Sequence, residues 1–279
     1  MSGRRPAQLS RRVNLLHLIL VPVTVAWMLP IVIVIGLSLK PTNDPGTIAF
    51  GMLPRSPSFA NYVTVFQQNP IPRYLFNSAL IAVPSVVLVV LLGSMAAFAL
   101  ARLRVPAKGW IFGLLTLALV LPMSSIVVAT FQVLQALGLY NSTFGVSIVY
   151  TALGLPFAII LIRTSFMAVP QETHDAAVVD GANKWQTFWH VYLPLARPAI
   201  AVVVVWQLML AWNDFLLPLV SLVDKDIKPL TLIPLVYRGE HFTQVGALFA
   251  ILIVVSVPIV ATFAIAQRSL VNGLAGAVK

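Results

Sequence analysis

Charged and aromatic side chains gather in one stretch of an otherwise apolar sequence, residues 174–194. The stretch holds Asp175, Asp180 and Lys184, and its second half contains four aromatic rings: Trp185, Phe188, Trp189 and Tyr192. The rings fall at positions i, i+3, i+4 and i+7, which share one face of an α-helix. A helix of this kind can bind a groove on another protein, or it can lie flat at a membrane–water interface. Spacing alone leaves both interpretations open.

The same stretch carries the signals of two short helices joined by a turn. Residues 171–180 follow a proline and contain good helix formers. Gly181 suits the position after a helix C-terminus, because the left-handed conformation costs glycine little. Asn183 and Gln186 match the capping-box pattern of a second helix, which Pro194 is expected to end. The prediction is therefore a bent pair of helices.

A second group of polar residues lies within an apolar segment further along the chain. Asp214 would lie about 9 Å from the outer end of a membrane span, at about 1.5 Å per residue, where a carboxylate should face water or a partner. It belongs to a polar and aromatic patch with Trp206, Gln207, Trp212 and Asn213. Trp212, Asn213 and Asp214 are candidates for a gate or a wall that faces the substrate. The alternative is a hydrogen bond that ends or bends the span near Pro218.

Composition indicates the class of protein that holds these groups. The 279 residues are 59% hydrophobic and 9% charged, with a mean hydropathy of +0.94, whereas soluble domains are about a quarter charged. This composition predicts an integral membrane protein. The net charge of +10 comes from short basic clusters beside apolar runs, which favours membrane proteins over nucleic-acid binding. No cysteine is present and the four histidines lack ligand spacing, so neither a metal site nor a catalytic residue is predicted.

Six apolar stretches are long enough to cross about 30 Å of hydrocarbon, namely 13–37, 76–100, 110–130, 144–168, 198–220 and 244–266. Backbone groups in lipid must pair internally, so the prediction is an all-α membrane protein with six transmembrane helices. Lys and Arg are more numerous in the segments that are inside when both termini are cytoplasmic, which predicts an N-in, C-in orientation. Residues 1–12 and 267–279 are then cytoplasmic ends of a transmembrane domain over 13–279. The loop 171–194 lies in the cytoplasm between spans four and five.

This loop resembles the EAA motif of ATP-binding-cassette (ABC) importer permeases. That pattern, Glu-Ala-Ala, three residues, Gly, and a hydrophobic-x-Leu-Pro ending, is met by Ala176, Ala177, Asp180, Gly181, Ala182, Leu193 and Pro194. Asp175 stands where the family usually has Glu. Other stretches, including "LPFAIILIRTSFMAVP" at 155–170 and "AWNDFLLPL" at 211–219, resemble the carbohydrate-uptake branch with its maltose-G-like permeases.

The resemblance implies that the loop is a coupling helix docking in a cleft of a cytoplasmic ATPase dimer. The implied ATPase-coupling residues are Asp175, Ala176, Ala177, Asp180, Gly181, Trp185, Phe188, Trp189, Leu193 and Pro194. It also implies a second permease subunit that completes a heterodimer, an extracytoplasmic solute-binding protein, and a bacterial inner membrane. No Gly-x-x-x-x-Gly-Lys phosphate loop occurs in the sequence. The chain is therefore not expected to be an enzyme or to hold a cofactor, and ATP and Mg²⁺ are expected on the partner ATPase.

The predicted function is that of a permease subunit of an ATP-driven, binding-protein-dependent sugar importer. It would form half of the pathway for an oligosaccharide, a disaccharide or a glycerol-phosphate-like solute. One alternative is the same kind of permease for a non-sugar solute, such as a polyamine or phosphate. Another is a stand-alone secondary carrier, against which the predicted spans offer no second carboxylate to pair with Asp214.

Overall fold

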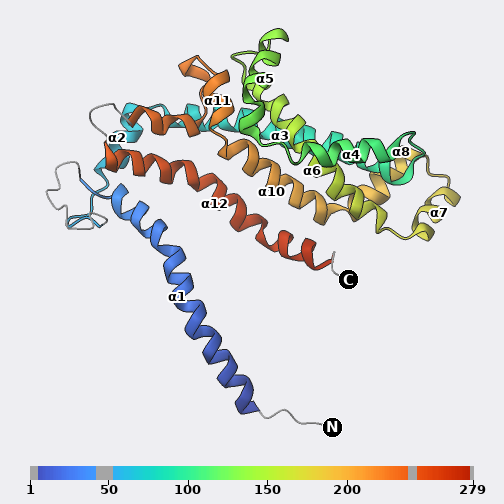
Figure 1. Cartoon of the computed structure of the whole chain (residues 1–279), viewed down its shortest axis with the longest axis horizontal. Coiled ribbons are helices and arrows are strands. Elements are labelled where there is room, and N and C mark those ends of the chain that lie inside the picture. Colours follow the sequence, from blue (N-terminus) through green and yellow to red (C-terminus); the bar gives the residue numbers. More distant parts are fainter. Residues whose placement is uncertain (1–5, 42–52, 238–243, 277–279) are drawn as a thin grey trace. The chain divides into compact units, whose positions relative to one another are not determined.

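The computed structural model describes residues 6–41, 53–237 and 244–276, and all regular secondary structure within them is helical (Figure 1). Residues 1–5 and 277–279, which belong to the two predicted cytoplasmic ends, lie outside this description. The chain forms two compact units, one of Met1–Asn69 with Pro234–Val254 and one of Pro70–Ile233 with Val255–Lys279.

The first unit holds α1 (Pro6–Ser38), α2 (Ala60–Gln68) and the beginning of α12 (Val245–Gly276). The Asn61 side chain donates hydrogen bonds to the backbone carbonyls of Ser38, at 2.9 Å, and Lys40, at 2.7 Å. These bonds satisfy carbonyl groups that the end of α1 leaves free. Large apolar side chains of α1 from Leu18 to Ile35 are mostly exposed, for example Trp27 at 77%. Since an apolar helix surface needs cover, α1 presents a face to lipid or to another chain.

The second unit is built on three helices that pack side by side (Figure 1), namely α3 (Ile71–Arg102), α6 (Thr143–Met167) and α10 (Arg197–Asn213). Small residues bring α3 and α6 together, because a Cβ added at Gly93 would meet the Cβ of Ala158 at 3.0 Å. The buried Gln207 of α10 donates to the Ser85 hydroxyl on α3 and, at 2.9 Å, to the Tyr150 carbonyl on α6. A shared amide therefore ties all three helices.

Two of the predicted spans are broken. The stretch 110–130 is divided between α4 (Lys108–Ala118) and α5 (Met123–Ala136), which meet at 106°. Pro122 lacks an N–H and disfavours a helical residue before it, so α4 cannot continue through it into α5. The stretch 198–220 is divided between α10 and α11 (Leu216–Ser221). Each stretch was predicted as one span, with a bend near Pro218 as the alternative for the second.

Four helices within the described residues are long and apolar enough to cross a membrane, or up to six if each of two bent pairs counts as one span. The four are His17–Ser38, Ile71–Arg102, Thr143–Met167 and Val245–Ile265. The chain is thus a multi-pass membrane protein, and six spans remain a prediction. Both terminal helices exceed their predicted spans, since α1 begins at Pro6 and α12 continues to Gly276.

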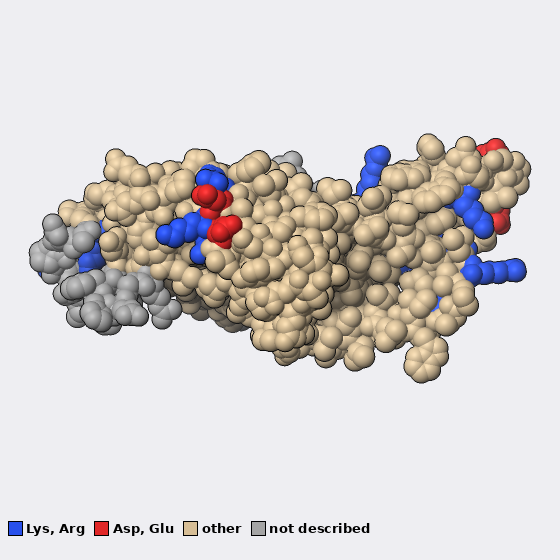
Figure 2. Space-filling view, turned by 90° about the horizontal axis from the view of Figure 1, so that it is seen from above, with Lys and Arg blue, Asp and Glu red and all other residues tan. Residues whose placement is uncertain are grey.

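Charged groups of the second unit lie at the two ends of α3. Arg73, in its first turn, pairs with Asp226 at 2.9 Å, whereas Arg102, in its last turn, donates to Gln171 at 2.9 Å. The 32 residues of α3 extend about 48 Å, which exceeds the roughly 30 Å of a hydrocarbon core. Figure 2 shows charged side chains in separate groups with a wide uncharged surface between them. The loop 171–194 and the segment around Asp226 therefore lie at opposite ends of a membrane-length helix.

Candidate functional site

The loop between α6 and α10 begins with α7 (Gln171–Val179), which ends in a Schellman turn at Gly181. Gly181 has φ +83°, the left-handed conformation that favours glycine. The Ala182 N–H donates to the Ala177 carbonyl and the Gly181 N–H donates to the Val178 carbonyl, both at 3.0 Å. The predicted role of Gly181 as the residue after the helix is confirmed.

A capping box then starts α8 (Lys184–Thr187). The Gln186 N–H donates to the Asn183 side chain at 2.9 Å, and the Asn183 N–H donates to the Gln186 side chain at 2.8 Å. This reciprocal pair satisfies two N–H groups that a helix start leaves free. Together with the Schellman turn it defines the angle between α7 and α8, as the sequence predicts.

The second helix does not end at Pro194. It widens into a π-helical turn at Phe188–Tyr192, continues as α9 (Leu193–Leu195), and breaks at Ala196 before α10. The Leu193 N–H bonds five residues back to the Phe188 carbonyl. Proline cannot donate to the ladder and displaces the carbonyl before it, and a wide turn accommodates this. The arm Lys184–Leu195 meets α10 at 76°.

The π turn divides the aromatic face that the spacing predicts. Trp185 and Trp189 are 60% and 45% exposed, whereas Phe188 and Tyr192 are buried at 2% and 0%. Residues four apart, Trp185 with Trp189 and Phe188 with Tyr192, stay on one side, whereas residues three apart are divided between the open and the buried side. Only the two tryptophans remain open to a partner, and Phe188 and Tyr192 belong to the interior of this chain.

The buried rings pack against the ends of α3 and α6. Phe98 of α3 lies 5.4 Å from Phe188 and 5.2 Å from Tyr192 between ring centroids. Phe166 of α6 lies 5.5 Å from Tyr192 in an edge-to-face arrangement. Each such pair contributes about 0.5–1.5 kcal/mol beyond its buried area. The loop is therefore attached firmly to two long helices.

Arg102 adds polar connections around the same cluster. Its guanidinium donates to the Phe166 carbonyl at 2.9 Å, to the Val169 carbonyl at 2.6 Å and to Gln171 at 2.9 Å. It also lies 5.1 Å from the Tyr192 ring centroid, within cation–π range. Sequence reasoning counted Arg102 only as a basic residue at the end of a span, because the carbonyls that it binds become neighbours only in the fold.

Tyr192 also connects the arm to α7. Its hydroxyl lies 3.1 Å from His174 Nδ1. Burial raises the pKa of the Tyr192 phenol above its ordinary value, opposed in part by the charge of Arg102. The Tyr192 hydroxyl therefore stays neutral at physiological pH, and its contact with His174 joins the two halves of the loop.

The outer surface of the loop is open. Asp175, Ala176, Asp180 and Gly181 are exposed, Leu193 and Pro194 are partly buried, and Ala177 is buried. Val179, which sequence reasoning did not single out, is 86% exposed. Exposed apolar side chains on the loop, Val179 and Trp185 among them, favour an interface with another protein.

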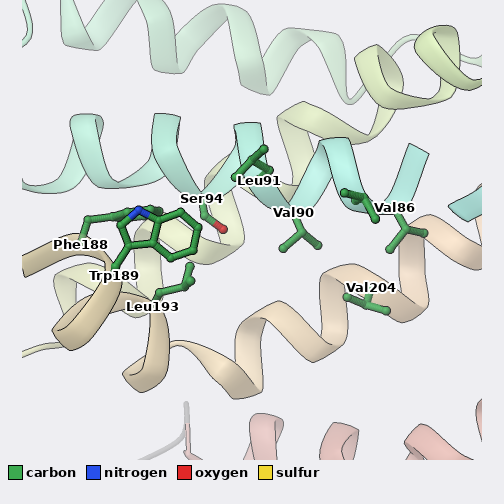
Figure 3. A pocket seen from close by; sticks show the side chains of 9 residues that line it. Val86, Val90, Leu91, Ser94, Phe188, Trp189, Leu193 and Val204 are labelled. Carbon is green, nitrogen blue, oxygen red and sulfur yellow. The ribbon is translucent and has the colours of Figure 1, made fainter. Parts of the chain in front are cut away.

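Trp189 also borders an apolar groove of about 330 Å³ between α3 and α10. Figure 3 shows Trp189 and Leu193 beside Ser94 of α3, with Val86 of α3 and Val204 of α10 further along the groove. The Ser94 hydroxyl is buried and makes no hydrogen bond within the described residues. A movement of the arm would change the shape of this groove.

Asp214 forms the break between α10 and α11. Its carboxylate accepts hydrogen bonds from the Tyr150 hydroxyl at 2.7 Å and from the backbone N–H groups of Leu216 and Leu217 at 3.2 Å. The alternative interpretation, a hydrogen bond that bends the span, is thereby confirmed. Trp212 is buried and donates to the Val255 carbonyl at 3.3 Å, so its ring faces the protein interior. Asn213 is exposed.

No group of three or more His, Cys, Asp or Glu side chains able to hold a metal ion occurs in the described part of the chain. The loop and the break at Asp214 are two places where polar groups gather within α6–α11. Neither carries a nucleophile and base arrangement of the kind that enzymes use. Both are suited to binding and movement.

Comparison with known proteins identifies the family. Residues 74–274 match the family described as "Binding-protein-dependent transport system inner membrane component". The chain belongs to this family. It is therefore a permease of ABC import systems, whose members transport solutes and work with a solute-binding protein.

Individual relatives agree with this assignment. The diacetylchitobiose uptake system permease of Streptomyces coelicolor is 32% identical over 98% of this chain and 89% of its own length. The trehalose transport system permease of Mycobacterium tuberculosis is 34% identical over 90% of this chain and 92% of its own. In fold, the chain resembles a crystal structure of a bacterial ABC transporter involved in alginate import, with a TM-score of 0.80 at 21% identity, over 96% and 99% of the two chains.

Proposed function

We propose that this permease subunit carries a sugar, either an oligosaccharide, a disaccharide or a glycerol-phosphate-like solute. Relatives that cover most of the chain are named for diacetylchitobiose, trehalose and lactose transport. These three solutes are neutral and rich in hydroxyl groups. The chain forms half of the pathway and pairs with a second permease subunit in a heterodimer, for which the exposed apolar α1 offers a surface.

The observation that carries the proposed coupling is the construction of the loop 171–194. Its buried side packs Phe188 and Tyr192 on α3 and α6, and its open side presents Val179 and Trp185. A separate ATPase dimer, which holds ATP and Mg²⁺, binds the open side. Closure of the ATPase pair then moves the arm, and the buried rings pass this motion to the spans. The pathway opens toward the extracytoplasmic binding protein and resets after hydrolysis.

This function requires a defined orientation. The loop lies in the cytoplasm of a bacterial cell with both termini on the same side, and the segment around Asp226 lies on the outer side of the inner membrane. The two sites occupy opposite ends of α3, which supports this arrangement. No cofactor is expected in the chain itself.

The test is uptake by the reconstituted assembly of both permeases, the ATPase and the binding protein. Radiolabelled trehalose, lactose and diacetylchitobiose are offered with ATP, and a non-sugar osmolyte serves as the comparison. We expect ATP-dependent accumulation of at least one sugar. Transport of the osmolyte alone would contradict the sugar assignment. Accumulation without ATP would contradict coupling to an ATPase.

One observation favours a second candidate solute. The permease for osmoprotective compounds of a Synechocystis species is 32% identical over 95% of this chain and 91% of its own length. A permease for compatible solutes would use the same loop and the same partners. The uptake panel separates the two candidates directly.

A further inference from the structure

A pocket of about 410 Å³ lies in the second unit, where the α4–α5 break faces α6 and α10. Its volume is in the range of small-molecule sites, about 300–1,000 Å³. The residues that give it chemical character are Tyr150, Phe157, Trp206, Asn213 and Asp214. The pocket is therefore more polar than the groove beside Trp189, which is almost wholly apolar.

The polar side of the pocket has unused hydrogen-bonding capacity. A carboxylate has about four acceptor positions, and Asp214 uses three of them for Tyr150, Leu216 and Leu217. The Asn213 amide is exposed and makes no side-chain hydrogen bond within the described residues. Between them, the two side chains can accept from and donate to a hydroxyl.

The Asn213 amide and the Asp214 carboxylate need hydrogen-bond partners that lipid tails cannot supply. Asn213 is the last residue of the 17-residue α10, and the helix that follows is apolar. A partly exposed carboxylate and a free amide within a membrane span are expected to face water or a partner. The pocket is therefore more consistent with a wall of the translocation pathway than with the lipid surface.

The apolar side of the pocket is a pair of aromatic rings. Phe157 of α6 and Trp206 of α10 lie 4.9 Å apart between centroids with 35° between their planes. Trp206 is 49% exposed, so its ring offers an uncovered surface. A sugar ring has an apolar face of C–H groups and a rim of hydroxyls. A flat apolar wall beside a few polar groups complements both.

We infer that this pocket binds a sugar ring of the solute during passage through the membrane. The sugar lies against Trp206 and Phe157, and its hydroxyls bond to Asn213 and the free acceptor position of Asp214. Tyr150 holds the Asp214 carboxylate in place. The inference rests on the proposed function and adds a binding site for its substrate. The tryptophan that contacts the sugar is then Trp206 and not the predicted Trp212, whose ring is buried.

The test measures sugar binding to the complete assembly held in one state by a non-hydrolysable ATP analogue. Radiolabelled trehalose, lactose and diacetylchitobiose are the probes. Trp206→Ala and Asn213→Ala are each expected to weaken retention of the transported sugar about tenfold, which corresponds to about 1.4 kcal/mol, and Trp206→Phe to restore most of it. Trp110→Ala is the matched control, because Trp110 is an 80% exposed tryptophan outside the pocket, and it should bind like the natural chain.

Two outcomes separate this inference from the proposed function. If the natural assembly retains a sugar and both Trp206→Ala and Asn213→Ala retain it equally well, the pocket is not the site and the sugar function stands. If the natural assembly transports none of the sugars, the proposed function itself fails. Asn213→Ala removes an exposed amide without disturbing packing, so the test does not depend on Trp206→Ala folding.

Discussion

At the scale of single residues, Arg102 is the side chain that connects most parts of the loop 171–194. It contacts the end of α6, the first residue of α7 and the Tyr192 ring. Its planar guanidinium presents several donors in a fixed arrangement, which the ammonium of lysine cannot reproduce. The charge alone would not hold two carbonyls and an amide at once. In the proposed function, Arg102 is therefore a positioning residue between the loop and the spans.

Arg102→Ala should uncouple the transporter. Hydrogen bonds to a charged group are worth about 1.5–3 kcal/mol each, so the arm would lose its attachment to α6 and α7. We expect uptake to fall at least tenfold while the ATPase still co-purifies, and Arg102→Lys to recover only part of it. Sugar uptake and ATP hydrolysis are measured in the same vesicles. Arg104→Ala, which removes an exposed arginine nearby, should leave the uptake per ATP unchanged. Equal effects of both alanine variants would count against the role of Arg102.

At the scale of elements, the sequence predicts what short-range chemistry determines. The turn at Gly181 and the cap at Asn183 depend on residues within five positions of each other, and both were predictable. The burial of Phe188 and Tyr192 depends on Phe98, which is far away in the chain. Helical periodicity assumes a regular helix, and the π turn before Pro194 invalidates that assumption. The break between α4 and α5 escapes prediction for a similar reason, since hydropathy reports length but not continuity. The break at Asp214 was one of the two interpretations that the sequence left open.

The Gly181 turn allows a test with little steric interference. A Cβ added at Gly181 would meet nothing within 4 Å, but φ there is +83°. Gly181→Ala therefore adds a conformational cost alone, roughly 1–2 kcal/mol, and should reduce both the thermal stability of the loop and uptake. Hydrogen exchange of α7 and α8 measures the first and vesicle transport the second. Gly113→Ala on α4, also with free space, should be neutral or stabilising. Asparagine tolerates the left-handed conformation better than alanine, so Gly181→Asn should perform better than Gly181→Ala.

At the scale of the whole molecule, the distribution of charge defines two sides. Within the second unit, Arg73 and Asp226 gather at the first turn of α3, and Arg102 and Gln171 meet at its last turn. Few charged side chains lie between, as expected for a segment in hydrocarbon. The count of basic residues along the sequence predicts which side is cytoplasmic. The fold adds that the loop 171–194 lies on the same side as the last turn of α3.

The absence of cysteine from the sequence makes this orientation directly measurable. Lys225 and Arg104 are both exposed. Lys225 is next to Asp226, which pairs with the first turn of α3, whereas Arg104 comes just after the last residue of α3. Lys225→Cys should react with a membrane-impermeant maleimide in intact spheroplasts, whereas Arg104→Cys should react only after the membrane is permeabilised. The natural chain offers no thiol, so its labelling is the background. Labelling of Arg104→Cys from outside, with Lys225→Cys protected, would reverse the orientation. Because the ATPase is cytoplasmic in the proposed function, that result would also remove the loop 171–194 from its reach.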